Sequence, residues 1–246
     1  MRKKVENCPP EMQNKREESL HKRPRQPTFD IPNKKLCRVF DSSHLIVYGE
    51  TAESIRRDNE WLHENAEVAA IDEIRPRLQA TAQERHERLR SLTISEALVL
   101  FPFLASEASL VVEFNILFKR DIVDDMGRGF QQLCDIILQH GDDTEVTVFQ
   151  KQREKDVPLT PCLLQEENGE FSLYIDKENT LRAASLLGGM ACHFASFWVF
   201  NIEYPKKACR LLTFIEHSFM GLSYTKPRVK ALELINFFKA HVASVV

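Results

Sequence analysis

Large apolar side chains recur at intervals of three and four positions along much of this 246-residue chain, and this spacing constrains the fold most strongly. Between residues 108 and 118 such side chains fall on one face of a helix, with Glu113 beside that face. The face consists of Leu110, Phe114, Leu117 and Phe118. Proline in the segment Phe101–Leu104 ends the preceding helix. With 43% hydrophobic residues available for a core, we predict a mainly α fold, an irregular helical domain.

Glycine and proline set the expected boundaries of the other helices. Between Arg56 and Arg90 charges dominate and Pro76 interrupts the apolar spacing, so two solvent-facing helices are expected there. Thr51 or Ser54 is expected to cap the first of them, after a short β-prone run at residues 45–48. Gly127 and Gly129 are expected to separate the 108–118 helix from the next. The remaining helices are predicted over about 130–140, 182–200, 205–220 and 228–243.

A different pattern appears between Asp142 and Asp176, where apolar and polar residues alternate as they do in strands. Residues 146–148 are the first such run. The segments 162–164 and Phe171–Ile175 are expected to pair as a hairpin, with Asn168-Gly169 in the turn. The sequence therefore predicts a small β-hairpin insertion near residues 146–175.

The first 43 residues differ in kind from the rest of the chain. They contain five prolines, and residues 1–40 hold eleven Lys or Arg against five Asp or Glu, a net charge of +6 that leaves −9 for the remainder. Such a segment buries too little apolar surface to offset its chain entropy. We therefore predict a disordered basic leader over residues 1–43 and one globular domain over residues 44–246.

The basic clusters of this leader are open to two interpretations. They contain Lys22, Arg23, Arg25, Lys34 and Lys35. These side chains are candidate contacts for a nuclear import receptor or for nucleic-acid phosphates. The alternative is a solvated tail without a partner.

No segment has the complete spacing of a known catalytic or metal-binding motif. His63-Glu64 resembles the start of the helical zinc-protease motif, but position 67 is Glu where a second His is required. The pair Gly188-Gly189 lacks the context of a phosphate-binding loop and is interpreted as close helix packing or a bend. The histidines and cysteines nearest one another lack paired zinc-ligand spacing; these are Cys192, His193, Cys209 and His217. We therefore predict no catalytic, metal-binding or cofactor-binding residue and no cofactor.

The aromatic-rich stretch Phe194–Phe200 has two readings, a base-stacking platform or part of the core. Stacking platforms combine aromatic side chains with nearby Lys or Arg, and residues 183–201 contain neither. The core is therefore the preferred interpretation.

Cysteine usage and hydropathy favour an intracellular protein, cytoplasmic or nuclear. The six cysteines are scattered without paired spacing and are expected to be reduced. The first residues are Met-Arg-Lys-Lys followed by a polar stretch, which lacks the apolar region of a secretory signal. The longest apolar stretch, Leu186–Phe200, is shorter than the roughly 20 residues that cross a bilayer. No membrane association is expected.

Two segments carry a resemblance to a known family. They are Phe200–Leu222, which reads FNIEYPKKACRLLTFIEHSFMGL, and FPFL at 101–104 followed by LVVEF at 110–114. They resemble the C-terminal region of the vertebrate, chiefly fish, sterile alpha motif domain-containing protein three-like family. The resemblance spans about residues 70–240 and implies that C-terminal module without the sterile alpha motif itself. It implies no site residues.

Abundant amphipathic helices without convergent polar groups favour a non-enzymatic protein-interaction or regulatory module with a protein partner. The alternative is a nuclear, nucleic-acid-associated protein that uses the basic N-terminal arm, since a body with a charge of about −9 repels phosphates. An enzyme whose site is assembled from distant residues is a third class. The sequence assigns no oligomeric state.

Overall fold

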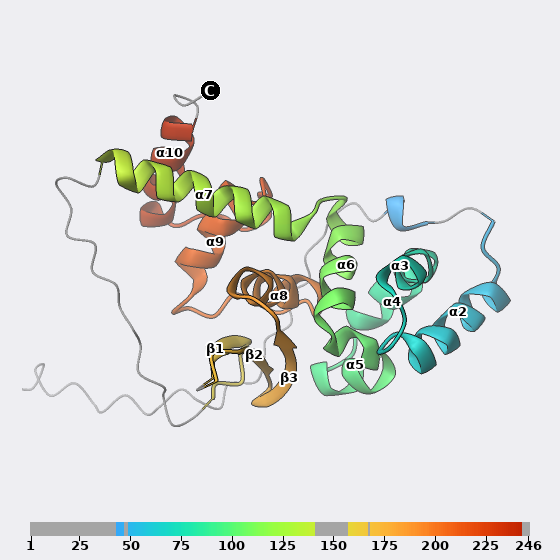
Figure 1. Ribbon diagram of the computed structural model, residues 1–246. Coiled ribbons are helices and arrows are strands. Elements are labelled where there is room, and N and C mark those ends of the chain that lie inside the picture. The colour runs from blue at the N-terminus through green and yellow to red at the C-terminus, as the bar shows by residue number, and fades with distance from the viewer. Residues whose placement is uncertain (1–42, 47–48, 141–156, 167, 243–246) are drawn as a thin grey trace, which may run out of the picture. The chain divides into compact units, whose positions relative to one another are not determined.

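The computed structural model describes residues 43–46, 49–140, 157–166 and 168–242, and helices dominate this part of the chain (Figure 1). The mainly helical prediction is confirmed. The predicted leader up to residue 42 and the predicted run at residues 146–148 lie outside the described residues. The α-helices are α2 (Ala52–Asn65), α3 (Ile71–Ala80), α4 (Ala82–Leu89), α5 (Ile94–Leu100), α6 (Glu107–Phe118), α7 (Ile122–His140), α8 (Leu186–Val199), α9 (Cys209–Ser218) and α10 (Val229–Val242). Buried side chains from all of them join one hydrophobic core.

Helix α2 begins at a hydroxyl cap. Thr51 caps α2 through a capping box, in which its side chain accepts a hydrogen bond from the Ser54 backbone and the Ser54 side chain accepts one in return. The β-prone run expected at residues 45–48 begins instead within a short 3-10 turn, η1 (Ser43–Leu45). A second 3-10 turn, η2 (Pro102–Ala105), separates α5 from α6, which confirms the predicted helix, proline turn and helix.

Three helices, rather than the expected two, occupy residues 52–89. Pro76 does not end a helix but lies inside α3. The helix continues because Ile74 and Leu78, on either side of the proline, are both buried in the core, and this burial outweighs the backbone hydrogen bond that proline cannot make. The chain breaks at Thr81 instead, between α3 and α4.

Helix α7 runs without a break through Gly127 and Gly129, so the expected separation at these glycines is wrong. The break lies earlier, where Lys119 ends α6 in the left-handed conformation with φ 52°. Asp121 then starts α7, because its Oδ1 accepts hydrogen bonds from the backbone N–H groups of Val123 and Asp124 at 3.0 and 3.1 Å.

The β insertion is a three-stranded antiparallel sheet in the order β1 (Cys162–Gln165), β2 (Phe171–Ile175) and β3 (Glu178–Ala183). The predicted hairpin is confirmed, with Cys162 opposite Tyr174 and Gly169 at φ 87° in the turn. Strand β3 was not predicted. Its two-residue turn, Asp176-Lys177, has φ of 53° and 71°, a conformation usually signalled by Asn-Gly. Because β3 occupies residues 178–183, α8 begins at Leu186 rather than near 182.

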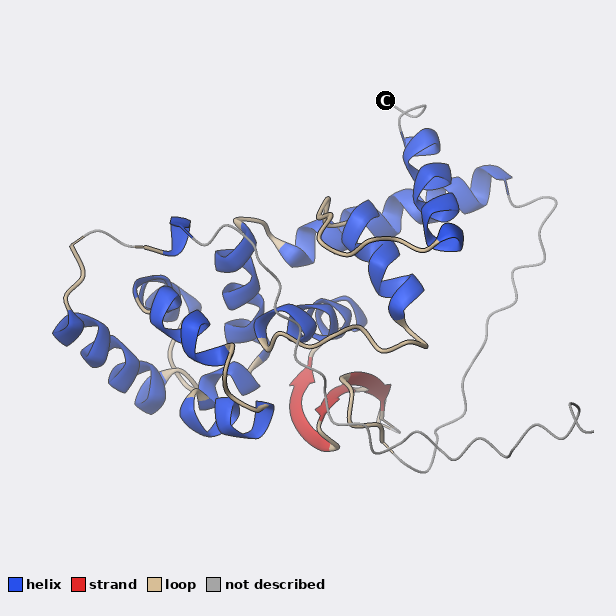
Figure 2. Ribbon diagram, turned by 180° about the vertical axis from the view of Figure 1, so that it is seen from behind, coloured by secondary structure: helices blue, strands red, loops and turns tan. Residues whose placement is uncertain are grey.

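Helix α8 lies at the centre of the fold. It packs against α6 and α7 and contacts all three strands (Figures 1 and 2). Close packing explains Gly189, because a Cβ at this position would lie 3.0 Å from the Leu163 side chain of β1 and 3.4 Å from Ala183 of β3. Asn201, with φ 53°, ends the helix and returns the Ile202 N–H to the Phe197 carbonyl at 2.8 Å.

The last two helices, α9 and α10, pack against each other, and α10 also contacts α7. Their observed bounds fall inside the predicted segments 205–220 and 228–243. Among the described helices, none is both long enough and apolar enough to cross a membrane.

Candidate functional site

The basic residues predicted to contact an import receptor or nucleic acid are outside the described residues. They are Lys22, Arg23, Arg25, Lys34 and Lys35. The structure therefore neither brings them together nor separates them.

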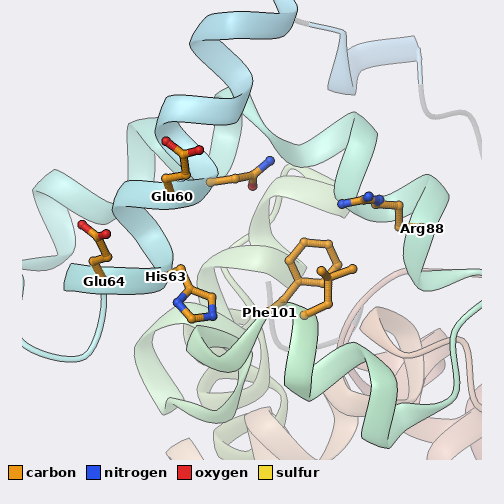
Figure 3. A pocket seen from close by; sticks show the side chains of 7 residues that line it. Glu60, His63, Glu64, Arg88 and Phe101 are labelled. Atoms are coloured by element: carbon orange, nitrogen blue, oxygen red, sulfur yellow. The ribbon is translucent and has the colours of Figure 1, made fainter.

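The His63-Glu64 segment lines a cleft between α2, α4 and the end of α5 (Figure 3). Its volume is about 250 Å³, and Phe101 and Leu100 supply the apolar part of its lining. Small-molecule sites usually enclose roughly 300–1,000 Å³. The cleft therefore suits a single side chain of a partner better than a whole substrate.

The polar groups around this cleft do not converge. Figure 3 shows His63 and Arg88 on opposite sides of Phe101, whereas the carboxylates of Glu60 and Glu64 point away from the ring. The Glu60 carboxylate forms an ion pair with Arg56, in which the Arg56 Nη1 lies 3.1 Å from the Glu60 Oε1. Within the described part of the chain, no group of three or more His, Cys, Asp or Glu side chains is arranged to hold a metal ion.

Cys192, His193, Cys209 and His217 lie in separate environments rather than in one cluster. The Cys192 Sγ lies 3.9 Å from the Glu107 carbonyl, and burial raises the pKa of this thiol far above its usual range. A thiol held in its protonated form is a poor nucleophile. The His193 Nε2 donates to the Pro161 carbonyl at 3.0 Å, and burial lowers the pKa of this imidazole.

The other two members also have local partners. The Cys209 Sγ lies 3.9 Å from the Thr213 Oγ1. The His217 Nε2 donates to the Thr225 carbonyl at 2.8 Å, which ties the loop after α9 to that helix. These contacts account for the two side chains as parts of the fold.

An ion pair that the sequence did not predict joins α4 to α6. Glu113, expected beside the apolar face of its helix, is completely buried, as is Arg85. The Arg85 Nε donates to the Glu113 Oε2 at 3.1 Å, and its Nη2 donates to the Leu78 carbonyl at 2.7 Å. Its remaining guanidinium nitrogen donates to Thr81. The arginine is enclosed by acceptors, so it links three helices and is closed to a ligand.

The aromatic-rich stretch of α8 lies in the core. Phe194, Phe197, Trp198 and Phe200 are each no more than 1% exposed. The Trp198 ring meets Phe118 edge-on, with centroids 5.0 Å apart. No face of these rings is presented for base stacking, in agreement with the preferred interpretation of this stretch.

Four of the eleven exposed large apolar side chains of the described residues lie on α10. This helix buries only Ala231, Ile235 and Phe238, with Phe238 packed on Phe214 and Phe219 of the α9 region. Large apolar side chains remain exposed on the rest of the helix: Val229 (73%), Leu232 (44%), Leu234 (45%) and Phe237 (46%). Among them the helix also carries the exposed polar side chains Lys230, Glu233, Asn236 and Lys239. The described part of the chain covers one strip of α10 and leaves the rest exposed.

Comparisons with protein-family models, curated proteins and solved structures give no match. The resemblance to the sterile alpha motif domain-containing protein three-like family therefore stays a prediction.

Proposed function

We propose that this chain is a non-enzymatic protein-interaction module and that α10 presents the surface its partner covers. The main observation that supports this proposal is the exposure of four large apolar side chains on a helix that buries only three residues. Apolar area in contact with water costs about 25 cal/mol per Å², and grouped exposed apolar residues commonly mark interaction sites. A partner that covers α10 would remove this cost.

Two features of the polar groups support an interaction role over an enzymatic one. The acidic side chains beside the α2 cleft point away from its apolar lining (Figure 3). The buried nucleophile Cys192 has a pKa raised by burial, which disfavours the thiolate that covalent catalysis requires.

Affinity capture with the tagged full chain tests the proposal. Leu234→Glu together with Phe237→Glu places charge on the exposed side of α10 and should abolish recovery of the partner. Both positions are about half exposed, so the fold should tolerate the change with only a small loss of stability. Circular dichroism and urea unfolding check that the variant is folded.

The matched control is Val68→Glu together with Val99→Glu, which adds the same charge at exposed apolar positions on other elements. A partner recovered equally by the native chain and the control, and lost with the α10 variant, is the expected result. Equal recovery with all three proteins would refute α10 as the interaction surface.

Nucleic-acid association through the basic arm is the second candidate, supported by the net charge of +6 on residues 1–40. Deleting these residues separates the two candidates. Binding to single-stranded RNA or duplex DNA at low salt should disappear with the deletion, whereas capture of a protein partner through α10 should persist. If the intact chain binds neither nucleic acid at low salt, this second candidate is wrong.

A further inference from the structure

The surface of the C-terminal segment carries positive charge that no carboxylate of the described residues neutralises. Seven exposed cations between residues 205 and 239 form no ion pair within the described structure: Lys206, Lys207, Arg210, Lys226, Arg228, Lys230 and Lys239. Glu233 is the one exposed carboxylate of this segment, and Glu216 is completely buried.

Several exposed cations of the earlier helices form ion pairs. Arg120 pairs with Asp125 at 2.6 Å, and Arg128 reaches the same carboxylate at 2.9 Å. On α2 and α4, exposed arginines pair one turn away, as Arg56 does with Glu60. Other exposed cations, Arg57, Arg75 and Lys119, also form no ion pair with a described residue, so what distinguishes the C-terminal segment is the number of its cations beside a single exposed carboxylate.

Charge and apolar surface coincide on one face of α10. Lys230, Leu234, Phe237 and His241 follow one another at intervals of four, three and four residues, so they form a strip along the helix. At about 1.5 Å per residue the strip is roughly 16 Å long, which matches three turns of a partner helix. Lys226 and Arg228 add positive charge at the N-terminal end of α10, where the helix dipole is also positive and the first turn contains no acidic residue.

We infer that this strip, Lys230, Leu234, Phe237 and His241, binds an acidic amphipathic helix of a partner protein. The inference rests on the proposed function and adds the chemistry of the partner. Apolar side chains of the partner would pack on Leu234 and Phe237, while its carboxylates would pair with Lys230 and with Lys226 and Arg228 at the N-terminal end of the strip.

The same features disfavour two other anionic ligands. An aliphatic side chain such as Leu234 offers no stacking partner to a nucleobase, and base-stacking surfaces rely on aromatic rings. Helices that lie on membranes separate a cationic face from an apolar face. On α10, Lys230 begins the strip that contains Leu234 and Phe237, so charge and apolar side chains share one face, and the adjacent strip of Ala231, Ile235 and Phe238 is buried in the protein.

A displayed library of random peptides of about 18 residues, selected against the full chain, tests the inference directly. Peptides retained by the native chain but released by the variant Leu234→Glu with Phe237→Glu should carry a net negative charge. Their apolar residues should recur at intervals of three and four. The best such peptide, made synthetically, should bind the α10 variant at least about tenfold more weakly, since truncating a central apolar contact typically costs a kilocalorie or more.

Charge is tested separately from apolar contact. Binding of the same peptide should be weaker in the combined variant Lys226→Glu, Arg228→Glu and Lys230→Glu. Raising the salt concentration should also weaken its binding to the native chain. Lys119→Glu with Lys177→Glu changes the charge of exposed lysines elsewhere and should leave binding unchanged. Equal weakening by both sets would show that the effect is general electrostatics and would overturn the role of the strip.

The remaining outcomes separate the acidic partner helix from the proposed interaction function of α10. Neutral or basic peptides that depend on Leu234 and Phe237 would overturn the acidic partner but keep the interaction surface. The absence of any peptide that depends on them would overturn both. Binding to phosphatidylserine vesicles or single-stranded RNA, or self-association in sedimentation, that is lost in the same variant would replace the partner helix with a lipid, an RNA or a second copy.

Discussion

At the scale of single residues, buried charge is the feature with the largest energetic consequence. Arg85 and Glu113 are both inaccessible to water, and the guanidinium is enclosed by Thr81 and the Leu78 carbonyl as well as the carboxylate. Such a pair contributes little net stability compared with an apolar replacement, but loss of one member leaves the other charged and unsolvated. We therefore expect the pair to fix how α4 packs on α6.

Replacing Glu113 by Leu is expected to lower the free energy of unfolding by about 3–5 kcal/mol, because Arg85 then stays buried without a counterion. Replacing both, Arg85→Met with Glu113→Leu, should cost less than the sum of the single changes. Urea unfolding of the four proteins measures this coupling. The exposed pair Arg56–Glu60 serves as the control, with an expected coupling below about 1 kcal/mol; similar couplings for both pairs would contradict the prediction.

His86 is a second buried residue with a consequence that can be measured. Burial is the main cause that lowers its pKa from 6.5 to about 4; the positive charge of Arg90 adds to the shift, and Glu87 opposes it. His86 therefore binds a proton near pH 6.5 in the unfolded chain but only near pH 4 in the folded chain. The stabilising effect of neutral His86 is complete above pH 6.5 and is lost as the pH falls through this window.

The loss by pH 4 should reach about 3 kcal/mol, at roughly 1.4 kcal/mol per pKa unit. His86→Gln is expected to flatten the dependence of unfolding free energy on pH between 6.5 and 4. His63→Gln, at an exposed position, should keep the native slope. Parallel profiles for the native chain and His86→Gln would show that His86 does not titrate in this way.

At the scale of elements, packing decides what the glycines of α7 do. Gly129 is buried against Phe219, whose ring and Cβ occupy the space that a methyl group would need. Gly127 lies two residues earlier on the same helix. A Cβ at this position would meet only the Leu187 side chain at 3.4 Å, which is an ordinary contact. The same residue type therefore has opposite roles at two nearby positions.

Gly129→Ala is expected to destabilise the protein by about 1–3 kcal/mol, because the Phe219 ring and its backbone must shift to accept the methyl group. Gly127→Ala should instead stabilise it by up to about 1 kcal/mol through helix propensity. Thermal and urea unfolding of the two variants give the signs directly. A stabilising Gly129→Ala would mean that α9 and its following loop do not pack on α7 as described.

At the scale of the whole described structure, one core connects the first helix to the last. Leu62 of α2 and Ile235 of α10 belong to the same set of buried residues. Helix α8 contacts both α6 and α7 within this core. A continuous core favours a single cooperative unfolding transition. Trp61 and Trp198, the two tryptophans of the chain, report on separate parts of it.

In a Trp198→Phe variant, the fluorescence of Trp61 and the circular dichroism signal of the protein should change at the same urea concentration. The same agreement is expected for Trp198 fluorescence in a Trp61→Phe variant. Leu62→Ala should lower both midpoints together, with a cost of about 2–5 kcal/mol. An earlier transition of Trp61 alone would show that α2 to α5 unfold independently of the C-terminal helices.

Local patterns in the sequence determined most elements of the fold. Three-and-four apolar spacing located the helices on both sides of the proline turn at residues 101–104 and the last two helices. A hydroxyl at Thr51 or Ser54 marked a helix start, and Asn168-Gly169 marked the hairpin turn. These signals work because they describe interactions within a few residues of one another. Asp176-Lys177 lacks that signal, and strand β3 was missed for this reason.

Contacts between distant segments decided the rest. Burial of Ile74 and Leu78 keeps α3 intact at Pro76, Phe219 explains why Gly129 lies within a helix, and Arg85 explains why Glu113 is buried. The candidate site follows the same rule. The sequence predicted a helix near residues 228–243, but apolar spacing is identical for a covered and an uncovered face, and only packing against α7 and α9 shows which side chains of α10 stay exposed.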